Sequence, residues 1–225
     1  MQKSIYLLFL IISASLFTNC HDSPTDSPPG NNITVSLAID NGLNKIGIDV
    51  IVLDTVKILL KDIKFRQAAG DSSNVKVGPM VVKLNLTGTP TEFAAGNAVA
   101  GNYSKIKFRL HKPEDVDVIS DPEFKSGISG DQRFSVIVKG KFNGTPFIYN
   151  STKTATQEVN LKSAINLTAD VKTNVTLSVD VNSWFHRGLL ILDPTNTANK
   201  NDIDNNIKDS FKKAFRDVNK DGIAD

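Results

Sequence analysis

The chain has 225 residues, with 26 Lys and Arg against 24 Asp and Glu, which gives a formal net charge of +2. The basic residues form no patch, so we expect no nucleic-acid partner. The single cysteine excludes an intramolecular disulfide, so folding depends on a hydrophobic core. The length fits one domain with a tail at each end, and a domain of this size can build such a core.

The first 19 residues have the features of a secretory signal peptide. Lys3 is their only charge, and an apolar run from Ile5 to Ile12 follows it. This run is shorter than the roughly 20 apolar residues that a transmembrane helix needs. We therefore expect residues 1–19 to be removed on export, and we expect no membrane-spanning segment elsewhere.

Cys20, the only cysteine, follows this stretch directly, after Leu16-Phe17-Thr18-Asn19. The arrangement resembles the lipobox of bacterial lipoproteins, in the looser form of spirochaetes, because Asn19 stands where Gly or Ala is usual. The resemblance implies that Cys20 carries a diacylglyceryl group and an acylated α-amine. Each buried CH2 of such chains contributes about 0.8 kcal/mol to anchoring. The alternative is an ordinary signal peptide followed by a chance cysteine.

Residues 20–32 form a predicted tether between the lipidated Cys20 and the folded domain. Pro, Ser, Asp and Asn dominate this segment, so it buries little apolar surface and is expected to be disordered and extended. The residue after Cys20 is His21, and not the Asp that retains lipoproteins in the inner membrane of enteric bacteria. We therefore expect an exported protein, lipid-anchored to the bacterial cell envelope at the outer membrane.

Most of residues 33–195 reads as β-strands. Alternation of apolar and polar residues, which indicates half-buried strands, occurs at 33–39, 82–86, 106–110, 134–138 and 175–181. Residues 56–66 are ambiguous between strand and helix, and we expect a strand with a bulge between Leu60 and Ile63. Asn143-Gly144 predicts a tight hairpin, because both central residues of a type I′ turn need positive φ.

Short strands with turn signals, without interleaved helices, predict a mainly β fold with an antiparallel β-sandwich over residues 33–195. Residues 196–225 differ in character. Ile203, Ile207, Phe211 and Phe215 recur every four residues, which predicts an amphipathic helix over 202–218 that Asn201 or Asp202 caps. An acidic Asp/Asn loop follows this helix.

Several segments resemble an uncharacterised family of bacterial exported lipoproteins with a β-sandwich domain. These segments are residues 100–110, 138–147, 184–194, 206–211 and 215–222. The resemblance covers roughly residues 33–225. It implies the fold class and an exported location, and it implies no particular activity.

The loop after the predicted helix carries oxygen-bearing side chains at alternate positions. Asp217, Asn219 and Asp221 precede Gly222, the backbone carbonyl of Ile223 follows, and Asp225 completes the set. Oxygen ligands at positions 1, 3 and 5 with Gly at 6 are what Ca²⁺ prefers, and the recurring Asp is similar to thrombospondin type 3 and dockerin loops. The alternative is a solvated acidic tail.

Trp184 and His186 follow the strand at 175–181 and are candidates for ligand contact, although a Trp there is also typical of core packing. The three histidines lack the spacing of a zinc site. No Gly-x-Ser-x-Gly, P-loop or His-Glu-x-x-His motif occurs. The acidic segment at 114–123 could hold general acids, but the nearby Pro113 and Pro122 favour solvated surface.

We therefore expect no enzyme. The sequence favours a membrane-anchored binding or structural module with an unknown protein or glycan ligand. Two alternatives stay open, a calcium-dependent adhesion module and a carbohydrate-active hydrolase.

Overall fold

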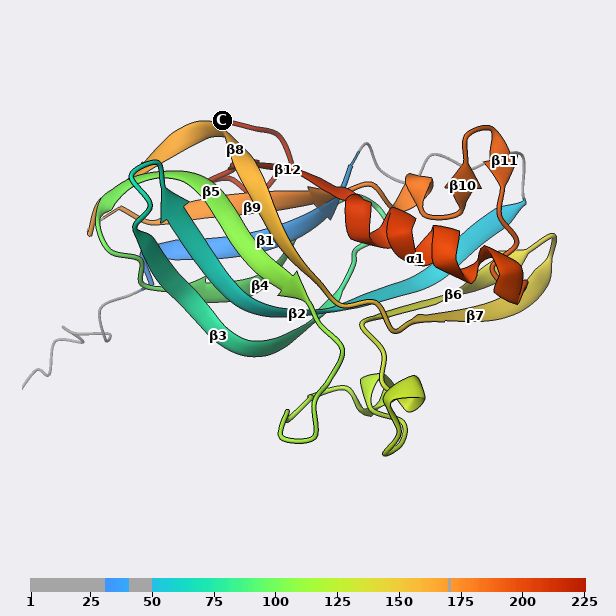
Figure 1. The fold of residues 1–225 in the computed structure, drawn as a ribbon. Helices are drawn as coiled ribbons and strands as arrows, with labels where there is room; N and C mark the ends of the chain where they lie inside the picture. Colours follow the sequence, from blue (N-terminus) through green and yellow to red (C-terminus); the bar gives the residue numbers. More distant parts are fainter. Residues whose placement is uncertain (1–30, 41–49, 170) are drawn as a thin grey trace, which may run out of the picture. The chain divides into compact units, whose positions relative to one another are not determined.

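The computed structural model describes residues 31–40, 50–169 and 171–225. The predicted signal peptide, Cys20 and most of the tether lie outside these residues. The described part is mainly β, with one strongly curled ten-stranded sheet and one short helix near the C-terminus, α1 (Lys200–Asp209) (Figure 1). The sheet contains β1 (Ile33–Ile39), β2 (Ile51–Gln67), β3 (Ser72–Lys83), β4 (Thr91–Gly96), β5 (Gly101–Leu110), β6 (Val136–Phe142), β7 (Thr145–Ser151), β8 (Ala155–Leu167), β9 (Thr173–Val179) and β12 (Phe211–Arg216), while β10 (His186–Arg187) and β11 (Leu190–Ile191) form a separate small hairpin.

The strand prediction for residues 56–66 is confirmed, and so is its bulge. β2 runs through the segment, and its register with β3 shifts between Lys61 and Ile63. Asp62, between them, has φ of +59°, and its Oδ1 accepts a hydrogen bond of 3.0 Å from the backbone N–H of Gly78 on β3. The bulge lets apolar residues before and after it face the same core.

The predicted hairpin at Asn143-Gly144 is also confirmed. It joins β6 to β7, and both turn residues have positive φ, +49° for Asn143 and +79° for Gly144. These are the values that a type I′ turn requires and that Asn and Gly tolerate.

The prediction of an antiparallel sandwich is wrong in its arrangement. The strands form one mixed sheet in the order β4-β1-β9-β12-β8-β5-β2-β6-β7, with β3 on the other edge of β2. β1 pairs parallel with β9, and β12 pairs parallel with β8. The 17-residue β2 pairs first with β6 and then with β5, so it joins both parts into one sheet. Side-chain alternation reports which face is buried, but it does not report strand direction or partner.

The predicted helix over 202–218 is correct only in its first half. α1 begins at Lys200 and ends at Asp209, and β12 follows it. Ile203 and Ile207 are buried from the helix, whereas Phe211 and Phe215 are buried from the strand. A spacing of four fits one face of a helix, so the pattern predicts that the helix continues. In the strand, however, the register shift between Phe211 and Lys213 separates the two residues, and Phe211 packs in the main core whereas Phe215 lines the neighbouring cavities. Pairing of β12 with β9 decides the outcome.

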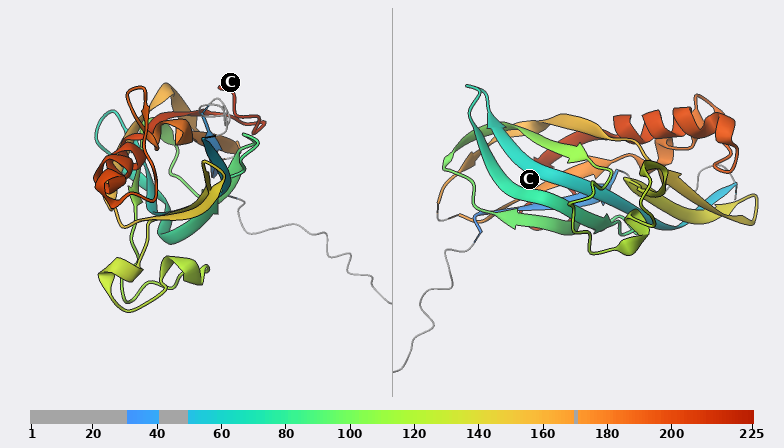
Figure 2. Two further views of the ribbon diagram at one scale, coloured as in Figure 1. Left: turned by 90° about the vertical axis from the view of Figure 1, so that its right-hand side faces the viewer. Right: turned by 60° about the horizontal axis from the view of Figure 1, so that its bottom comes forward.

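The sheet is strongly curled in the end-on view (Figure 2, left), and the buried apolar side chains of its strands form the main core. β3 and β4 approach each other closely, and a Cβ on Gly96 would lie 2.1 Å from the Val75 carbonyl oxygen. Val99 N–H, just after β4, donates to Ser73 Oγ at 3.1 Å. Residues 196–225 belong to the same compact unit, Asn31–Asp225, as the rest of the sheet.

Candidate functional site

The predicted site residues lie in different parts of the fold. Trp184 and His186 lie beside α1, and the proposed calcium ligands form the loop after β12. Cys20 is outside the described residues. Two further features are an acidic segment after β5, which is held by polar contacts, and two cavities beside the C-terminal loop.

Asp217 is the centre of the C-terminal loop and is fully buried. Its Oδ1 accepts a 3.0 Å hydrogen bond from Asp221 N–H, and its Oδ2 accepts 3.1 Å and 2.6 Å bonds from Gly222 N–H and Thr176 Oγ1. Asn174 Nδ2 donates to the carbonyl of Asp217 at 2.9 Å. The carboxylate therefore links the turn, through Thr176, to strand β9.

The other predicted ligands stabilise the same turn. Asp221 Oδ1 accepts from Ile223 N–H at 2.8 Å, Asp221 Oδ2 accepts from Asn219 Nδ2 at 2.9 Å, and Asp225 Oδ2 accepts from Val218 N–H at 2.9 Å. In the part of the chain that the structure describes, no three His, Cys, Asp or Glu side chains converge closely enough to hold a metal ion. Calcium binding would therefore require the side chains of Asn219 and Asp221 to rearrange from these contacts.

Trp184 is fully buried in the main core, and His186 is partly buried. His186 Nδ1 lies 2.7 Å from the carbonyl of Asn182. Asn206 on α1 donates through Nδ2 to the carbonyls of Trp184 at 3.1 Å and His186 at 2.7 Å. The segment thus holds α1 against the sheet, and the Trp184 side chain is not presented to solvent.

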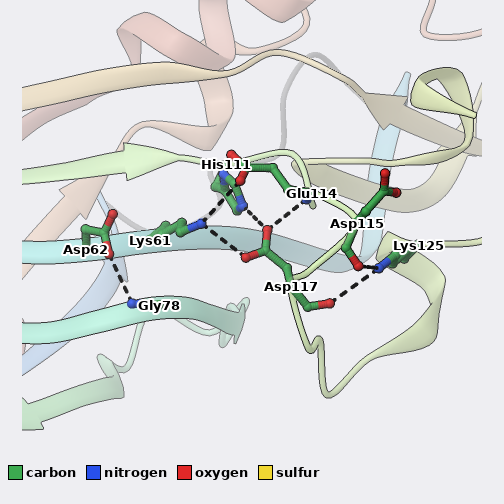
Figure 3. Close-up of polar contacts among 8 residues, drawn as sticks. All are labelled: Lys61, Asp62, Gly78, His111, Glu114, Asp115, Asp117 and Lys125. Carbon is green, nitrogen blue, oxygen red and sulfur yellow. Dashed lines mark hydrogen bonds and ion pairs between the residues drawn. The ribbon is translucent and has the colours of Figure 1, made fainter.

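The acidic segment between β5 and β6 projects from the sheet and is held by a polar cluster (Figures 1 and 3). Asp117 Oδ2 lies 2.6 Å from Nε2 of the buried His111 and accepts from Glu114 N–H at 2.8 Å, while Oδ1 accepts from Lys61 Nζ at 3.1 Å. Burial alone would raise the pKa of Asp117, but the hydrogen bonds from Glu114, His111 and Lys61 outweigh it and lower that pKa to about 2. Sequence reasoning singled out the acidic segment but missed its partners His111 and Lys61, which meet Asp117 only in the fold.

A second set of contacts holds the far part of the same segment. Lys57 Nζ contacts Asp121 at 2.5 Å and Glu123 at 3.0 Å, and Lys139 contacts Glu123 at 2.7 Å. The hydrogen bond to Asp121 raises the pKa of Lys57 despite its burial. Phe124 packs in a small core with Leu59 and Ile137 on the outer face of the sheet. Three large side chains of the segment are nevertheless exposed to solvent, namely Val116, Val118 and Ile128.

Two adjoining cavities flank the C-terminal loop, with volumes of about 620 and 640 Å³. Asp40, Phe215, Gly222 and Ile223 line both of them. The first also has hydroxyl groups, from Thr87, Thr89 and Ser178. The second is lined by three lysines, Lys162, Lys212 and Lys213. Sequence reasoning missed the second cavity, because it placed Lys212 and Lys213 on a helix.

Asp40 and Asp221 are the two carboxylates of the first cavity. Asp40 pairs with Lys213 at 2.6 Å, and Asp221 accepts the turn hydrogen bonds described above. Both are therefore engaged in structural contacts. The arrangement can bind a ligand, but it offers no free pair of carboxyl groups for acid–base chemistry.

Comparisons with known proteins identify no family: no family model matches the chain, and no curated protein matches it. Among solved structures, the chain is similar to MbnP from Methylosinus trichosporium, with 9% sequence identity and a TM-score of 0.36. The match covers 68% of this chain and 75% of that one. Within the described residues, none of the helices has the length and apolar character needed to cross a membrane.

Proposed function

We propose that this protein is an exported, lipid-anchored binding module of the bacterial cell envelope, and not a catalyst. The observation that carries the proposal is the apolar stretch at residues 1–19 ending at Cys20, the only cysteine of the chain. Several acyl chains on one residue anchor a protein stably where a single chain does not.

The start of the folded unit is compatible with a tether directly before it. Asn32 Nδ2 donates to the Ala98 carbonyl at 2.8 Å, and Ala98 N–H donates to Asn32 Oδ1 at 2.9 Å. The chain is therefore fixed to the domain from Asn32 onward, at the C-terminal end of the predicted tether. Any ligand would then meet the surface of the domain, because the anchored end is occupied by lipid.

Replacement of the cysteine tests the anchor. The full chain and its Cys20→Ser variant would be expressed in a lipoprotein-processing bacterium that is fed an alkyne fatty acid. We expect the label only on the unchanged chain, and we expect Cys20→Ser to move the protein from the membrane to the soluble fraction. Asn19→Gly, which restores the usual lipobox residue, should keep the label. An unlabelled wild-type chain would contradict the proposal.

The same labelled cells test the predicted location. Separation of inner and outer membranes on a density gradient should place the wild-type chain with the outer membrane. A chain found only with the inner membrane would leave the lipid anchor standing and would overturn the outer-membrane assignment.

Calcium binding by the C-terminal loop is the second candidate function. The observation in its favour is the turn itself, in which Gly222 has φ of +84° and Asp217 accepts from the N–H groups of Asp221 and Gly222. An affinity of about 10⁻⁴ to 10⁻³ M is expected for such an open site. Calorimetric titration should give heat for the wild-type chain and for Asp131→Ala, but not for Asp221→Ala. Identical heats for all three at millimolar Ca²⁺ would exclude it.

A carbohydrate-active hydrolase is the less favoured alternative. Such an enzyme uses two carboxyl groups facing one substrate bond, one of which is protonated. The two carboxylates of the first cavity, Asp40 and Asp221, each have hydrogen-bonding partners instead. We therefore retain the non-catalytic proposal.

A further inference from the structure

Two of the lysines that line the second cavity, beside the C-terminal loop, lie at a register shift in β12. The register of β12 with β9 shifts between Phe211 and Lys213, so the alternation of the strand is interrupted there. Both Lys212 and Lys213 are exposed, and both line this cavity. In a regular strand, two consecutive side chains would point to opposite faces. Bulges of this kind redirect side chains at functional sites.

The space between β12 and β8 arises because these strands pair at one position only, Ala214 with Leu161. On β8, the next outward residue after Leu161 is Lys162, which faces the same cavity as Lys212. The floor and the remaining wall are largely apolar, with Ala214, Phe215, Ile223 and Ala224. The cavity therefore combines an apolar surface with a cationic rim.

The positive charge of this rim is only partly neutralised. Lys213 pairs with Asp40 at 2.6 Å, whereas Lys162 and Lys212 have no acidic partner among the described residues. The nearby carboxylate of Asp225 is directed to Val218 N–H at 2.9 Å and lies 3.8 Å from Arg216 Nε. Two ammonium groups beside an apolar wall favour a ligand that carries an anionic group on an apolar body.

We propose that this cavity binds an anionic amphiphile, with the head group at Lys162 and Lys212 and the apolar body against Phe215 and Ile223. This inference names a ligand class for the proposed binding module and rests on that function. It does not depend on the lipid anchor, so the two can fail separately. The first cavity shares Phe215 and Ile223 and can accept the distal part of a longer ligand.

The test uses the full chain with Cys20→Ser, so that no attached lipid competes for the cavity. The probe is 8-anilinonaphthalene-1-sulfonate, whose fluorescence rises when its apolar rings leave water. The test variant is Lys162→Glu/Lys212→Glu. The matched control, Lys141→Glu/Lys172→Glu, changes the net charge equally at two exposed lysines that do not line the cavity. Thermal melting confirms that each variant folds, and Lys162→Gln/Lys212→Gln replaces the test variant if it does not.

We expect the test variant to bind the probe about tenfold more weakly than the unchanged chain, and the control variant to bind like the unchanged chain. Dodecanoate should displace the probe, whereas the same concentration of inorganic phosphate should not. Equal binding by both double variants, or no binding by the unchanged chain, overturns the proposal. Displacement by phosphate as effective as that by dodecanoate also overturns it, because the apolar wall would then contribute nothing.

Discussion

Asp117 shows how one side chain can order a long segment of this protein. Its carboxylate accepts hydrogen bonds from Lys61 on β2 and from the backbone N–H of Glu114, and it contacts the imidazole of His111 (Figure 3). A buried carboxylate is costly unless such donors surround it. The cluster therefore stabilises the projecting segment, and loss of its central charge leaves Lys61 without its closest carboxylate.

Replacement of Asp117 by Asn should destabilise the folded state by about 2 kcal/mol, because a hydrogen-bonded charge in a buried network is lost. The matched control is Asp131→Asn, an exposed carboxylate in the same segment. Urea denaturation measures both variants. Equal stability of the two would show that the Asp117 contacts contribute nothing to folding.

Acid should weaken the folded state through the same carboxylate. The pKa of Asp117 is about 2 in the folded protein against an ordinary value of 3.8, so its contribution is fully present above about pH 4. That contribution is lost as the pH falls towards 2. The pKa values of Asp121 and Glu123 are also lowered, chiefly by Lys57 and Lys139, which adds to the same trend. Denaturation at several pH values should show a shallower acid dependence for Asp117→Asn than for the wild-type chain.

At the scale of the elements, the sequence indicated most strands but not their arrangement. Alternation located β1 and β9, and the Asn143-Gly144 pair located one turn, because these signals are local. The parallel pairing of β1 with β9 joins residues about 140 positions apart, and no local signal reports it. The change from α1 to β12 was missed because Phe211 and Phe215 continue the four-residue spacing of Ile203 and Ile207, and the irregular burial pattern of β12 does not read as a strand.

The candidate site also has features that local sequence signals predict and features that depend on long-range pairing. The turn at Asp217 could be recognised because its residues are consecutive. The lysine-lined cavity could not, because Lys162 and Lys212 come together only through the single pairing of β8 with β12. The burial of Trp184 depends on α1 and the sheet meeting around it, which is also a tertiary effect.

The close approach of β4 to β3 predicts a position where only glycine fits. In Gly96→Ala the new Cβ would lie 2.1 Å from the Val75 carbonyl oxygen, so the backbone must shift, at a cost of about 1–3 kcal/mol. Gly101→Ala is the matched control, because its Cβ would meet the end of the flexible Gln67 side chain. Chemical denaturation should show the larger loss for Gly96→Ala, and the reverse order would contradict this account of the curled sheet.

At the scale of the whole molecule, the two ends of the folded chain lie in one part of the sheet. β9 is paired with β1 on one edge and with β12 on the other. β12 also contacts β8, so the last strand joins two parts of the sheet. The C-terminal region is therefore central to the fold, although it is the last part of the sequence.

Two deletions with opposite expected effects test this topology. Deletion of residues 210–225 removes β12, which leaves β9 and β8 with unpaired edges and exposes the apolar surface that Phe211 and Phe215 cover. We expect this chain to lose cooperative thermal unfolding and to aggregate. Deletion of residues 1–30 removes none of the described strands and should leave the melting temperature of the domain unchanged. Circular dichroism and size-exclusion chromatography report both outcomes. A cooperative melt of the chain without β12 would mean that the remaining strands close the sheet by themselves, and the central role of the last strand would then be wrong.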